Sequence, residues 1–334
     1  MPPWTHLSRP YLIAEVGGNH EGDFDAARSL CDLAIESGAD CVKFQLYTGD
    51  TLVSPVESPE RHRHFQRFEL RPEQHLELAQ RCRQRGVGYN ASVWDPGMLE
   101  WIDPQLDFYK IGSGDLTAWT VLAEFARRGK PMVLSTGLSD LQEVLDTVDF
   151  LQQANPLYRE PGMLVILQCT ALYPLDSDQV NLRAMDTLRQ ATGLEVGYSD
   201  HTTDSLALLV AASRGARVLE FHFTDQREGK TFRDHKVSLT ADEVRSLKEQ
   251  VRRIESLLGD SEKVPTPGER ETGHVTSFRR ALYSRRSLKA GDRLQAEDLV
   301  ALRPNHGIDA RQYREVVGKR VKRDTDAYQA IELE

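Results

Sequence analysis

The chain alternates short runs of apolar residues with longer segments in which apolar residues recur every three or four positions. The longer segments, such as residues 25–37 and 71–85, have the spacing of amphipathic helices, whereas short apolar runs are typical of buried strands. Eight such runs occur, at residues 11–16, 41–46, 88–92, 108–111, 131–135, 164–169, 195–198 and 218–222. This regular alternation indicates a parallel α/β fold.

Two parallel α/β architectures fit the alternation, a (β/α)₈ TIM barrel and a doubly wound sheet. Eight repeats over about 250 residues favour the barrel. No Gly-x-Gly-x-x-Gly follows the first strand, which argues against a dinucleotide-binding sheet. We therefore predict a TIM barrel over residues 1–258.

The pattern changes after residue 258. Residues 259–276 are rich in Pro, Gly, Glu and Thr, which predicts a linker. Residues 277–334 contain short apolar runs and turns such as KAGD at 289–292, which predict a second, small and mostly β domain.

Composition narrows the range of partners and compartments. The chain has 42 basic and 51 acidic residues and a net charge of −9, which argues against nucleic acid or an anionic membrane as a partner. Four scattered cysteines without a Cys-x-x-Cys pair indicate free thiols in a reducing compartment. No run approaches the ~20 apolar residues of a membrane span, and residues 1–4 lack the apolar run of a signal peptide. We expect a cytoplasmic protein.

Two histidines stand at the ends of neighbouring predicted strands. His201 follows the seventh strand and His222 ends the eighth. In a TIM barrel the active residues come from these strand ends, so both imidazoles would reach one mouth. Two imidazoles suit a divalent metal that keeps positions open for substrate. The alternative interpretation is two hydrogen-bonded polar groups at strand ends.

Two lysines, Lys43 and Lys110, lie inside short apolar strands, where an ammonium group is costly unless it meets an anion. They either pair with a structural carboxylate such as Glu15 or bind phosphate and carboxylate together with nearby hydroxyls and glycine-rich turns. A Schiff-base lysine is a third interpretation. The metal-type histidines make it less favoured, because a metal held by them would already supply electrophilic activation.

Acidic and polar residues complete the predicted mouth. Glu15 is interpreted as a general acid or base, as a ligand to substrate hydroxyls, or as a partner of Lys43. Asp234 would orient substrate, touch the metal through water, or be a solvated loop acid. His62, His64 and His75 lie in or near an arginine-rich segment that we interpret as a polar excursion, with a lid as the alternative. Further polar residues near strand ends are Gln45, Ser92, Ser113, Asp115, Ser135, Tyr173 and Ser199.

With these residues collected, the chain resembles the sialic acid synthase family, which condenses phosphoenolpyruvate with N-acetylmannosamine, its phosphate or related N-acylated sugars. The barrel motifs that carry the resemblance are IAEVGGNHEG (13–22), VKFQ (42–45), YKIGSGD (109–115), LSTG (134–137), CTALYP (169–174), SDHT (199–202) and HFT (222–224). The tail is similar to the family's antifreeze-like (SAF) domain through RRALY (279–283), LKAGD (288–292), LRP (302–304) and VGK (317–319).

The resemblance implies a role for each candidate residue. His201 and His222 would hold a divalent metal, often manganese in this family, with magnesium or cobalt as alternatives. Phosphoenolpyruvate would be held by Lys43, Ser92, Lys110, Ser113 and Ser135. The sugar or the reacting centre would face Glu15, Gln45, Asp115, Tyr173, Ser199 and Asp234, of which Glu15, Asp115 and Asp234 are the catalytic candidates. Arg303 would reach the N-acyl group from the partner subunit's tail, which implies a domain-swapped homodimer.

The chain departs from the family pattern at several points. It reads SVW at 92–94 where Thr-Pro-Phe is common, and QCTA at 168–171 where His-Cys-Thr is followed by Asn or Ser. It reads TFRDH at 231–235 in place of Pro-Gly-Pro-Asp-His, and DAYQ at 326–329 where a Lys-Gly turn is common. Most changes fall on the sugar side or in the tail. We therefore predict an acceptor other than plain N-acetylmannosamine.

Three other functions compete with this interpretation. Another phosphoenolpyruvate aldol synthase, of the keto-deoxy-octulosonate type, is disfavoured by the tail domain and Arg303. A non-catalytic or regulatory relative is disfavoured by the retained lysines and histidines. A metal-dependent barrel hydrolase usually carries a His-x-His pair on the first strand, which is absent here.

Overall fold

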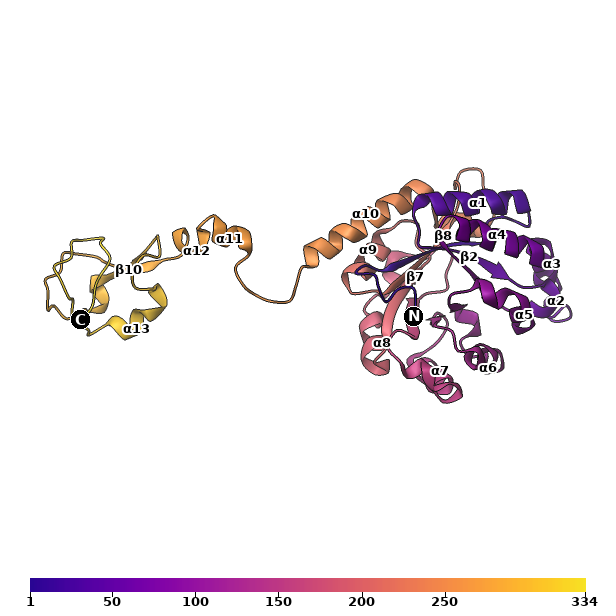
Figure 1. The fold of residues 1–334 in the computed structure, drawn as a ribbon, viewed down its shortest axis with the longest axis horizontal. Helices are drawn as coiled ribbons and strands as arrows, with labels where there is room; N and C mark the ends of the chain where they lie inside the picture. Colours follow the sequence, from indigo (N-terminus) through magenta and orange to yellow (C-terminus); the bar gives the residue numbers. More distant parts are fainter. The chain divides into compact units, whose positions relative to one another are not determined.

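The computed structural model describes residues 1–334 and divides them into two compact units, Met1–Gly259 and Asp260–Glu334. In the first unit, helices surround a ring of parallel strands, which confirms the predicted TIM barrel (Figure 1). Its strands are β1 Tyr11–Gly17, β2 Cys41–Leu46, β3 Gly88–Val93, β4 Tyr109–Ile111, β5 Met132–Ser135, β6 Leu164–Cys169, β7 Glu195–Asp200, β8 Val218–Phe223 and the short β9 Ser238–Leu239.

The helices of the first unit alternate with these strands. They are α1 Phe24–Ser37, α2 Gly49–Leu52, α3 Pro59–Phe68, α4 Pro72–Gln84, α5 Leu99–Ile102, α6 Trp119–Arg128, α7 Leu141–Ala154, α8 Ala184–Thr192, α9 Leu206–Ser213 and α10 Ala241–Leu258. Local signals fix their ends. Asp23 caps α1 by accepting hydrogen bonds from the backbone N–H groups of Asp25 and Ala26, and Gly38 ends α1 in the left-handed region.

The strands form where the apolar runs predict them because a parallel sheet inside a ring of helices is buried on both faces. All seven residues of β1 are buried, and β2 and β6 have the predicted bounds. The main difference lies between β2 and α4. There the chain forms α2 and α3, which the sequence pattern does not predict, because only Phe68 of α3 is buried.

The ring of strands has one seam. Backbone hydrogen bonds join the strands in the order β3-β2-β1-β8-β7-β6-β5-β4, so no ladder joins the neighbours β3 and β4. Instead, the buried Asn90 side chain of β3 donates from Nδ2 to the Phe108 carbonyl, just before β4, over 2.8 Å. This amide bridges the two strands at the seam.

The two faces of the barrel differ. At the face where the strands begin, Trp4, Tyr11 and Phe108 pack edge to face with ring centroids 5.2–6.2 Å apart. This aromatic cluster closes that face. The opposite face, where the strands end, is left to hold the polar strand-end residues.

The second unit is small and mostly irregular, with an antiparallel pair of strands. Its elements are α11 Pro267–Glu271, α12 His274–Ser277, β10 Ala281–Ser284, β11 Leu299–Leu302 and α13 Tyr313–Val316. Its own core gathers Leu282, Leu288, Leu294, Leu299, Val316, Val321 and Ile331. The helix α11 and most of α12 lie within the stretch expected to be a linker, where Thr266 and Glu269 form a capping box. No helix of the protein has the length and apolar character that a bilayer crossing requires.

Candidate active site

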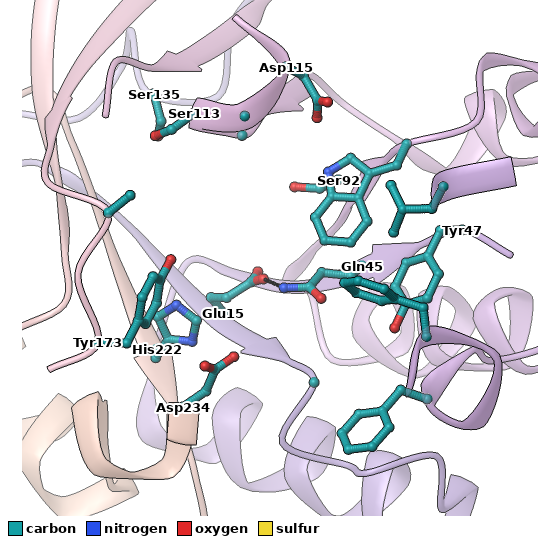
Figure 2. A pocket seen from close by; sticks show the side chains of 18 of the residues that line it. Glu15, Gln45, Tyr47, Ser92, Ser113, Asp115, Ser135, Tyr173, His222 and Asp234 are labelled. Atoms are coloured by element: carbon teal, nitrogen blue, oxygen red, sulfur yellow. Dashed lines mark hydrogen bonds between the residues drawn. The ribbon is translucent and has the colours of Figure 1, made fainter. Parts of the chain in front are cut away.

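One cavity of about 1090 Å³ opens at the strand ends of the barrel. It is lined by every predicted site residue of the barrel: Glu15, Lys43, Gln45, Ser92, Lys110, Ser113, Asp115, Ser135, Tyr173, Ser199, His201, His222 and Asp234. Figure 2 shows Tyr173, His222 and Asp234 on one side, Ser113, Ser135 and Asp115 on another, and Glu15 between them. The fold therefore brings these residues, which are spread over more than 200 positions of the sequence, to one place.

Four buried charges form the inner end of this cavity, and we call them the charged cluster: Glu15, Lys43, Lys110 and Glu220. The Lys43 Nζ pairs with Glu15 and lies 3.4 Å from Glu220 Oε1. The Lys110 Nζ lies 3.4 Å from Glu220 Oε2. Two carboxylates thus balance two ammonium groups.

Serine hydroxyls surround the charged cluster. Lys43 donates to Ser92 Oγ over 3.1 Å, and Lys110 donates to Ser135 Oγ over 2.9 Å. Ser199 donates to Glu220 Oε2 over 2.8 Å. These hydroxyls fix the ammonium and carboxylate groups and can also donate to an anion bound beside them.

The two carboxyl groups of the cluster have very different proton affinities. Burial raises the pKa of Glu15 to about 7, because Lys43 offsets only part of the desolvation and Glu220 adds repulsion. Burial also opposes ionisation of Glu220, but Lys110 and Lys43 outweigh it and lower the pKa of Glu220 to about 2. Glu220 is therefore a fixed anion at neutral pH, whereas Glu15 is poised to gain or lose a proton.

The two predicted metal ligands lie close together. The ring centroids of His201 and His222 are 5.4 Å apart, and Tyr173 packs on His201 with centroids 4.0 Å apart. His201 donates from Nδ1 to the Thr170 carbonyl over 2.7 Å, which leaves its Nε2 free. The Nδ1 of His222 is buried without a hydrogen-bond partner. Burial lowers the pKa of both imidazoles to about 4, so both are neutral, as metal ligands must be.

A third protein ligand does not join this pair. No group of three or more His, Cys, Asp or Glu side chains in the structure could hold a metal ion together. A free nitrogen on one imidazole and an unpartnered nitrogen on the other fit a divalent cation that takes its remaining ligands from water or substrate.

Two further carboxyl groups face the cavity. Burial raises the pKa of Asp115, which Lys110 partly offsets. Burial also raises the pKa of Asp234, against an ion pair of 3.2 Å with Arg233. Asp115 follows β4 two positions after Ser113, and Asp234 lies near His222, as Figure 2 shows.

Arg303 is the one predicted site residue that does not line the cavity. It belongs to the second unit, where it is exposed and its guanidinium carbon lies 5.7 Å from the centre of the Phe278 ring. His20 is structural, because its Nδ1 accepts from the Gly22 backbone N–H over 3.0 Å.

Some of the residues that depart from the family pattern line the cavity and others do not. Trp94, Ala171 and Arg233 line the cavity, whereas Gln168 donates to the Val180 carbonyl beside it.

Sequence reasoning missed two parts of the site. Glu220 stands two positions before His222 on β8, so strand alternation puts both on the same face, and that signal was available. The second part is aromatic. Tyr47, Phe65, Phe68, Trp94 and Phe232 line the outer cavity. Phe65 and Phe68 come from α3, whose sequence is otherwise mostly polar, so no apolar pattern marks these two residues as buried.

Comparison with known proteins agrees with this geometry. Residues 30–263 match the NeuB family, and residues 279–329 match the SAF domain. An N,N'-diacetyllegionaminic acid synthase of Legionella pneumophila is 35% identical over 95% of this chain and 92% of that protein. The N-acetylneuraminate-9-phosphate synthase of Homo sapiens is 32% identical over 80% of this chain and 76% of that protein.

A solved structure extends the likeness to three dimensions. The N-acetylneuraminic acid (sialic acid) synthetase of Leptospira borgpetersenii, in complex with citrate, superposes with a TM-score of 0.73 at 27% identity. The match covers 80% of this chain and 91% of that one. The resemblance found in the sequence motifs is thus confirmed, and so is the enzyme class, a transferase that forms carbon–carbon bonds. The chain belongs to the NeuB family of acid synthases, with an SAF domain at its C-terminal end.

Proposed function

We propose that the protein condenses phosphoenolpyruvate with the open-chain aldehyde of an N-acylated hexosamine, giving a nine-carbon α-keto acid and phosphate. One observation carries the proposal: a charged cluster with two lysines and a pair of neutral imidazoles face the same cavity. The names of the relatives, which are synthases of sialic-type acids, support the same chemistry.

Phosphoenolpyruvate would lie at the inner end of the cavity. Lys43 and Lys110 would face its phosphate and carboxylate, with Ser92, Ser113 and Ser135 donating from their hydroxyls. The charged cluster is neutral without ligand when Glu15 is ionised. A highly charged anion therefore favours uptake of a proton by Glu15, whose pKa of about 7 makes that change inexpensive.

His201 and His222 would hold the divalent metal, which we propose to be manganese. When bound, such a cation polarises an aldehyde oxygen as a Lewis acid. Tyr173 packs against both imidazoles, with ring centroids 4.0 and 5.6 Å away, and would keep their orientation fixed.

The bond changes follow from the two substrates. The methylene carbon of phosphoenolpyruvate attacks the aldehyde carbon, and the aldehyde oxygen takes a proton to become a hydroxyl group. Water adds to the cationic carbon two and loses a proton. The carbon–oxygen bond to phosphate then breaks with its electron pair leaving on phosphate, and the hydroxyl group at carbon two gives its proton to the departing phosphate or to solvent, which leaves the keto group. Glu15 would transfer a proton at its Oε atoms, with Asp115 and Asp234 as the other candidates.

We propose a domain-swapped homodimer in which Arg303 of one tail reaches the N-acyl group in the partner's barrel. The presence of an SAF domain behind a NeuB barrel supports this arrangement. So does the exposure of the Arg303 guanidinium, which makes no ion pair in its own unit.

A direct assay tests the function. Purified protein is incubated with manganese, phosphoenolpyruvate and a panel of N-acyl hexosamines, and phosphate release is followed together with the product mass. We expect acceptor-dependent phosphate release that chelator and His222→Ala abolish. The variant His6→Ala, at an exposed histidine outside the cavity, is the matched control and should keep full activity.

If the assay gives no phosphate release, a measurement of phosphoenolpyruvate binding separates two explanations. If no acceptor gives phosphate release but calorimetry detects phosphoenolpyruvate binding that Lys110→Met removes, the protein is a non-catalytic binding relative. If phosphoenolpyruvate does not bind at all, the proposed function is wrong.

A further inference from the structure

The outer part of the cavity is an aromatic wall, formed by Tyr47, Phe65, Phe68, Trp94 and Phe232. Its rings pack on one another. Tyr47 stacks on Trp94 with centroids 5.1 Å apart, and Phe65 meets both edge to face. Phe68 lies 5.0 Å from Phe232, centroid to centroid. The rings therefore hold one another in place before any ligand arrives.

Strand alternation places the aromatic wall directly outside the phosphoenolpyruvate end. Lys43, Gln45 and Tyr47 are spaced two apart along and just beyond β2, and Ser92 on β3 and Trp94 just beyond it are spaced likewise. In a barrel, successive inward residues form successive layers toward the mouth. Tyr47 and Trp94 thus form the layer above Gln45 and Ser92. An acceptor whose aldehyde end meets the inner layer must lay its remote end along these two rings.

Two hydrogen-bonding groups of the aromatic wall, the Trp94 indole N–H and the Tyr47 hydroxyl, have no partner in the protein. The indole N–H groups of Trp4 and Trp119 donate to protein oxygens over 3.1 Å, whereas those of Trp94 and Trp101 have no protein acceptor, and of these two only Trp94 lines the cavity. The Trp94 Nε1 is close to Gly112, 3.8 Å from where a β-carbon there would stand, and Gly112 also lines the cavity. The buried Tyr47 side chain likewise makes no hydrogen bond from its hydroxyl, which burial keeps protonated by raising its pKa.

The cations near the aromatic wall lie at its solvent-exposed rim. Arg233 is paired with Asp234 over 3.2 Å. Arg61 is exposed and lies over the Phe65 ring, with its guanidinium carbon 5.8 Å from the ring centre. No buried cation faces the aromatic wall, so the rings themselves present an apolar and hydrogen-bonding surface rather than a charged one.

We propose that the aromatic wall is the subsite for a second N-acyl group of the acceptor sugar, remote from the aldehyde. This inference rests on the proposed function and deepens it. An acylamido group has an apolar methyl that packs on Tyr47 and Phe65, and a carbonyl oxygen that accepts from the Trp94 indole N–H and the Tyr47 hydroxyl. A hydroxyl group fills neither the apolar surface nor both donors. Trp94 is therefore a specificity-determining residue, and the preferred acceptor is a di-N-acylated, unphosphorylated hexosamine.

The test compares three matched acceptors with phosphoenolpyruvate and manganese. They are N-acetylmannosamine, its six-phosphate, and the analogue in which the hydroxyl two carbons beyond the first acetamido group is replaced by a second one. For the wild-type protein we expect kcat/KM to be at least about tenfold higher for the diacetamido acceptor. Trp94→Ala should lower kcat/KM for that acceptor about thirtyfold and for N-acetylmannosamine less than about threefold.

Milder variants guard against misfolding. Trp94→Phe and Tyr47→Phe keep the rings and each remove one donor, and each should cost about fivefold for the diacetamido acceptor alone. Trp119→Phe, at a tryptophan stacked on Phe150 outside the cavity, is the matched control. The KM for phosphoenolpyruvate should stay unchanged in all of them.

Two results would overturn the inference while leaving the proposed function standing. One is equal or better use of either mono-N-acyl acceptor by the wild-type protein. The other is an equal loss for all acceptors in the Trp94 variants. If no acceptor releases phosphate, the proposed function fails and binding decides the inference. The diacetamido sugar should then change the tryptophan fluorescence of the wild type and of Trp119→Phe but not of Trp94→Phe, and no change in any of them contradicts it.

Discussion

At the scale of single residues, Glu220 links the two lysines of the site. Its two carboxylate oxygens each lie 3.4 Å from a different ammonium nitrogen, and Ser199 donates to one of them. The Glu220 side chain is only 8% exposed, so water screens the attraction between its carboxylate and the two ammonium groups very little. Glu220 thus fixes the spacing of Lys43 and Lys110 at the place where the anionic substrate is proposed to bind.

Neutralising this carboxylate should destabilise the barrel. Glu220→Gln leaves two buried ammonium groups with one carboxylate, and the free energy of unfolding should fall by about 3 kcal/mol. Phosphoenolpyruvate should stabilise the variant more than the wild type, because it supplies the missing negative charge. Urea unfolding followed by tryptophan fluorescence measures both effects, since all four tryptophans lie in the barrel unit.

The matched control is Glu36→Gln, at an exposed acid on α1. It should leave stability and the effect of phosphoenolpyruvate unchanged. Equal stabilisation of Glu220→Gln and wild type by phosphoenolpyruvate would contradict the proposed charge relationship.

A second buried residue predicts a pH dependence away from the site. His75 is fully buried, with its Nδ1 2.8 Å from the Tyr89 hydroxyl, and burial lowers its pKa to about 3. Below about pH 6.5 the unfolded chain binds a proton at His75 that the folded chain does not. The free energy of unfolding should therefore fall as the pH falls from about 6.5 toward 3, by up to about 1.4 kcal/mol per pH unit from this group.

The variant His75→Gln isolates this contribution. The slope of unfolding free energy against pH between pH 6 and 4.5 should be shallower than in the wild type by up to one proton. His6→Gln, at an exposed histidine, should keep the wild-type slope. An unchanged slope in His75→Gln would show that His75 does not resist protonation in the folded state.

At the scale of elements, α3 gives the cavity its outer side. Arg61, His64, Phe65 and Phe68 all line the cavity, and their spacing of three, four and seven positions puts them on one helix face. The β1–α1 loop supports this helix from behind. A β-carbon on Gly22 would stand 2.1 Å from the Arg67 carbonyl oxygen, so loop and helix backbone are in direct contact.

Gly22→Ala should therefore detach α3. The substitution must push the Arg67 carbonyl away, and we expect tryptic cleavage within α3 to become at least about fivefold faster. Gly86→Ala is the matched control, because Gly86 also has a positive φ, +70° against +83°, but has no atom within 4 Å of its β-carbon position. It should cost stability through backbone strain without exposing α3. Equal cleavage rates in the two variants would show that α3 does not depend on this contact.

Some elements were predictable from the sequence and others were not. β2 and β6 were, because strands buried on both faces consist mostly of apolar residues, interrupted here only by Lys43 and Gln45 in β2 and by Gln168 in β6. The polar mouth followed from alternation along the strands, which put the side chains of Lys43 and Gln45 on the same face of β2. The helix α3 was not, because a helix that covers a cavity rim buries too little apolar surface to leave a helical pattern. Trp94 appeared only as a departure from the family motif, since its role depends on Tyr47 and Phe65 from another element.

At the scale of the whole molecule, the residues proposed for the site fall in two units. Thirteen predicted site residues line the barrel cavity, whereas Arg303 lies in the SAF unit. The residue pattern predicts the barrel part, whereas the role of Arg303 and the exchange of tails between subunits are implied only by the family resemblance. Which tail meets which barrel is a question about subunits, and it needs an experiment on mixed assemblies.

Complementation answers it. His222→Ala and Arg303→Ala should each be nearly inactive alone. Co-expressed in equal amounts with different tags, they should recover about a quarter of wild-type activity, because half of the dimers are mixed and one of their two swapped sites is intact. Activity is measured as acceptor-dependent phosphate release. No recovery in the isolated mixed dimer would show that each tail serves its own barrel.

The seam between β3 and β4 has a consequence for divergence within the family. Three of the four charges of the cluster stand on β8, β1 and β2, which a continuous ladder joins, whereas Lys110 on β4 and Trp94 just beyond β3 flank the seam that the Asn90 amide bridges. We expect a substitution beside the seam to shift one of these strand ends without disturbing the register of the ladder from β8 to β2. The Trp94 side of the cavity should therefore tolerate changes that the Glu15, Lys43 and Glu220 side does not.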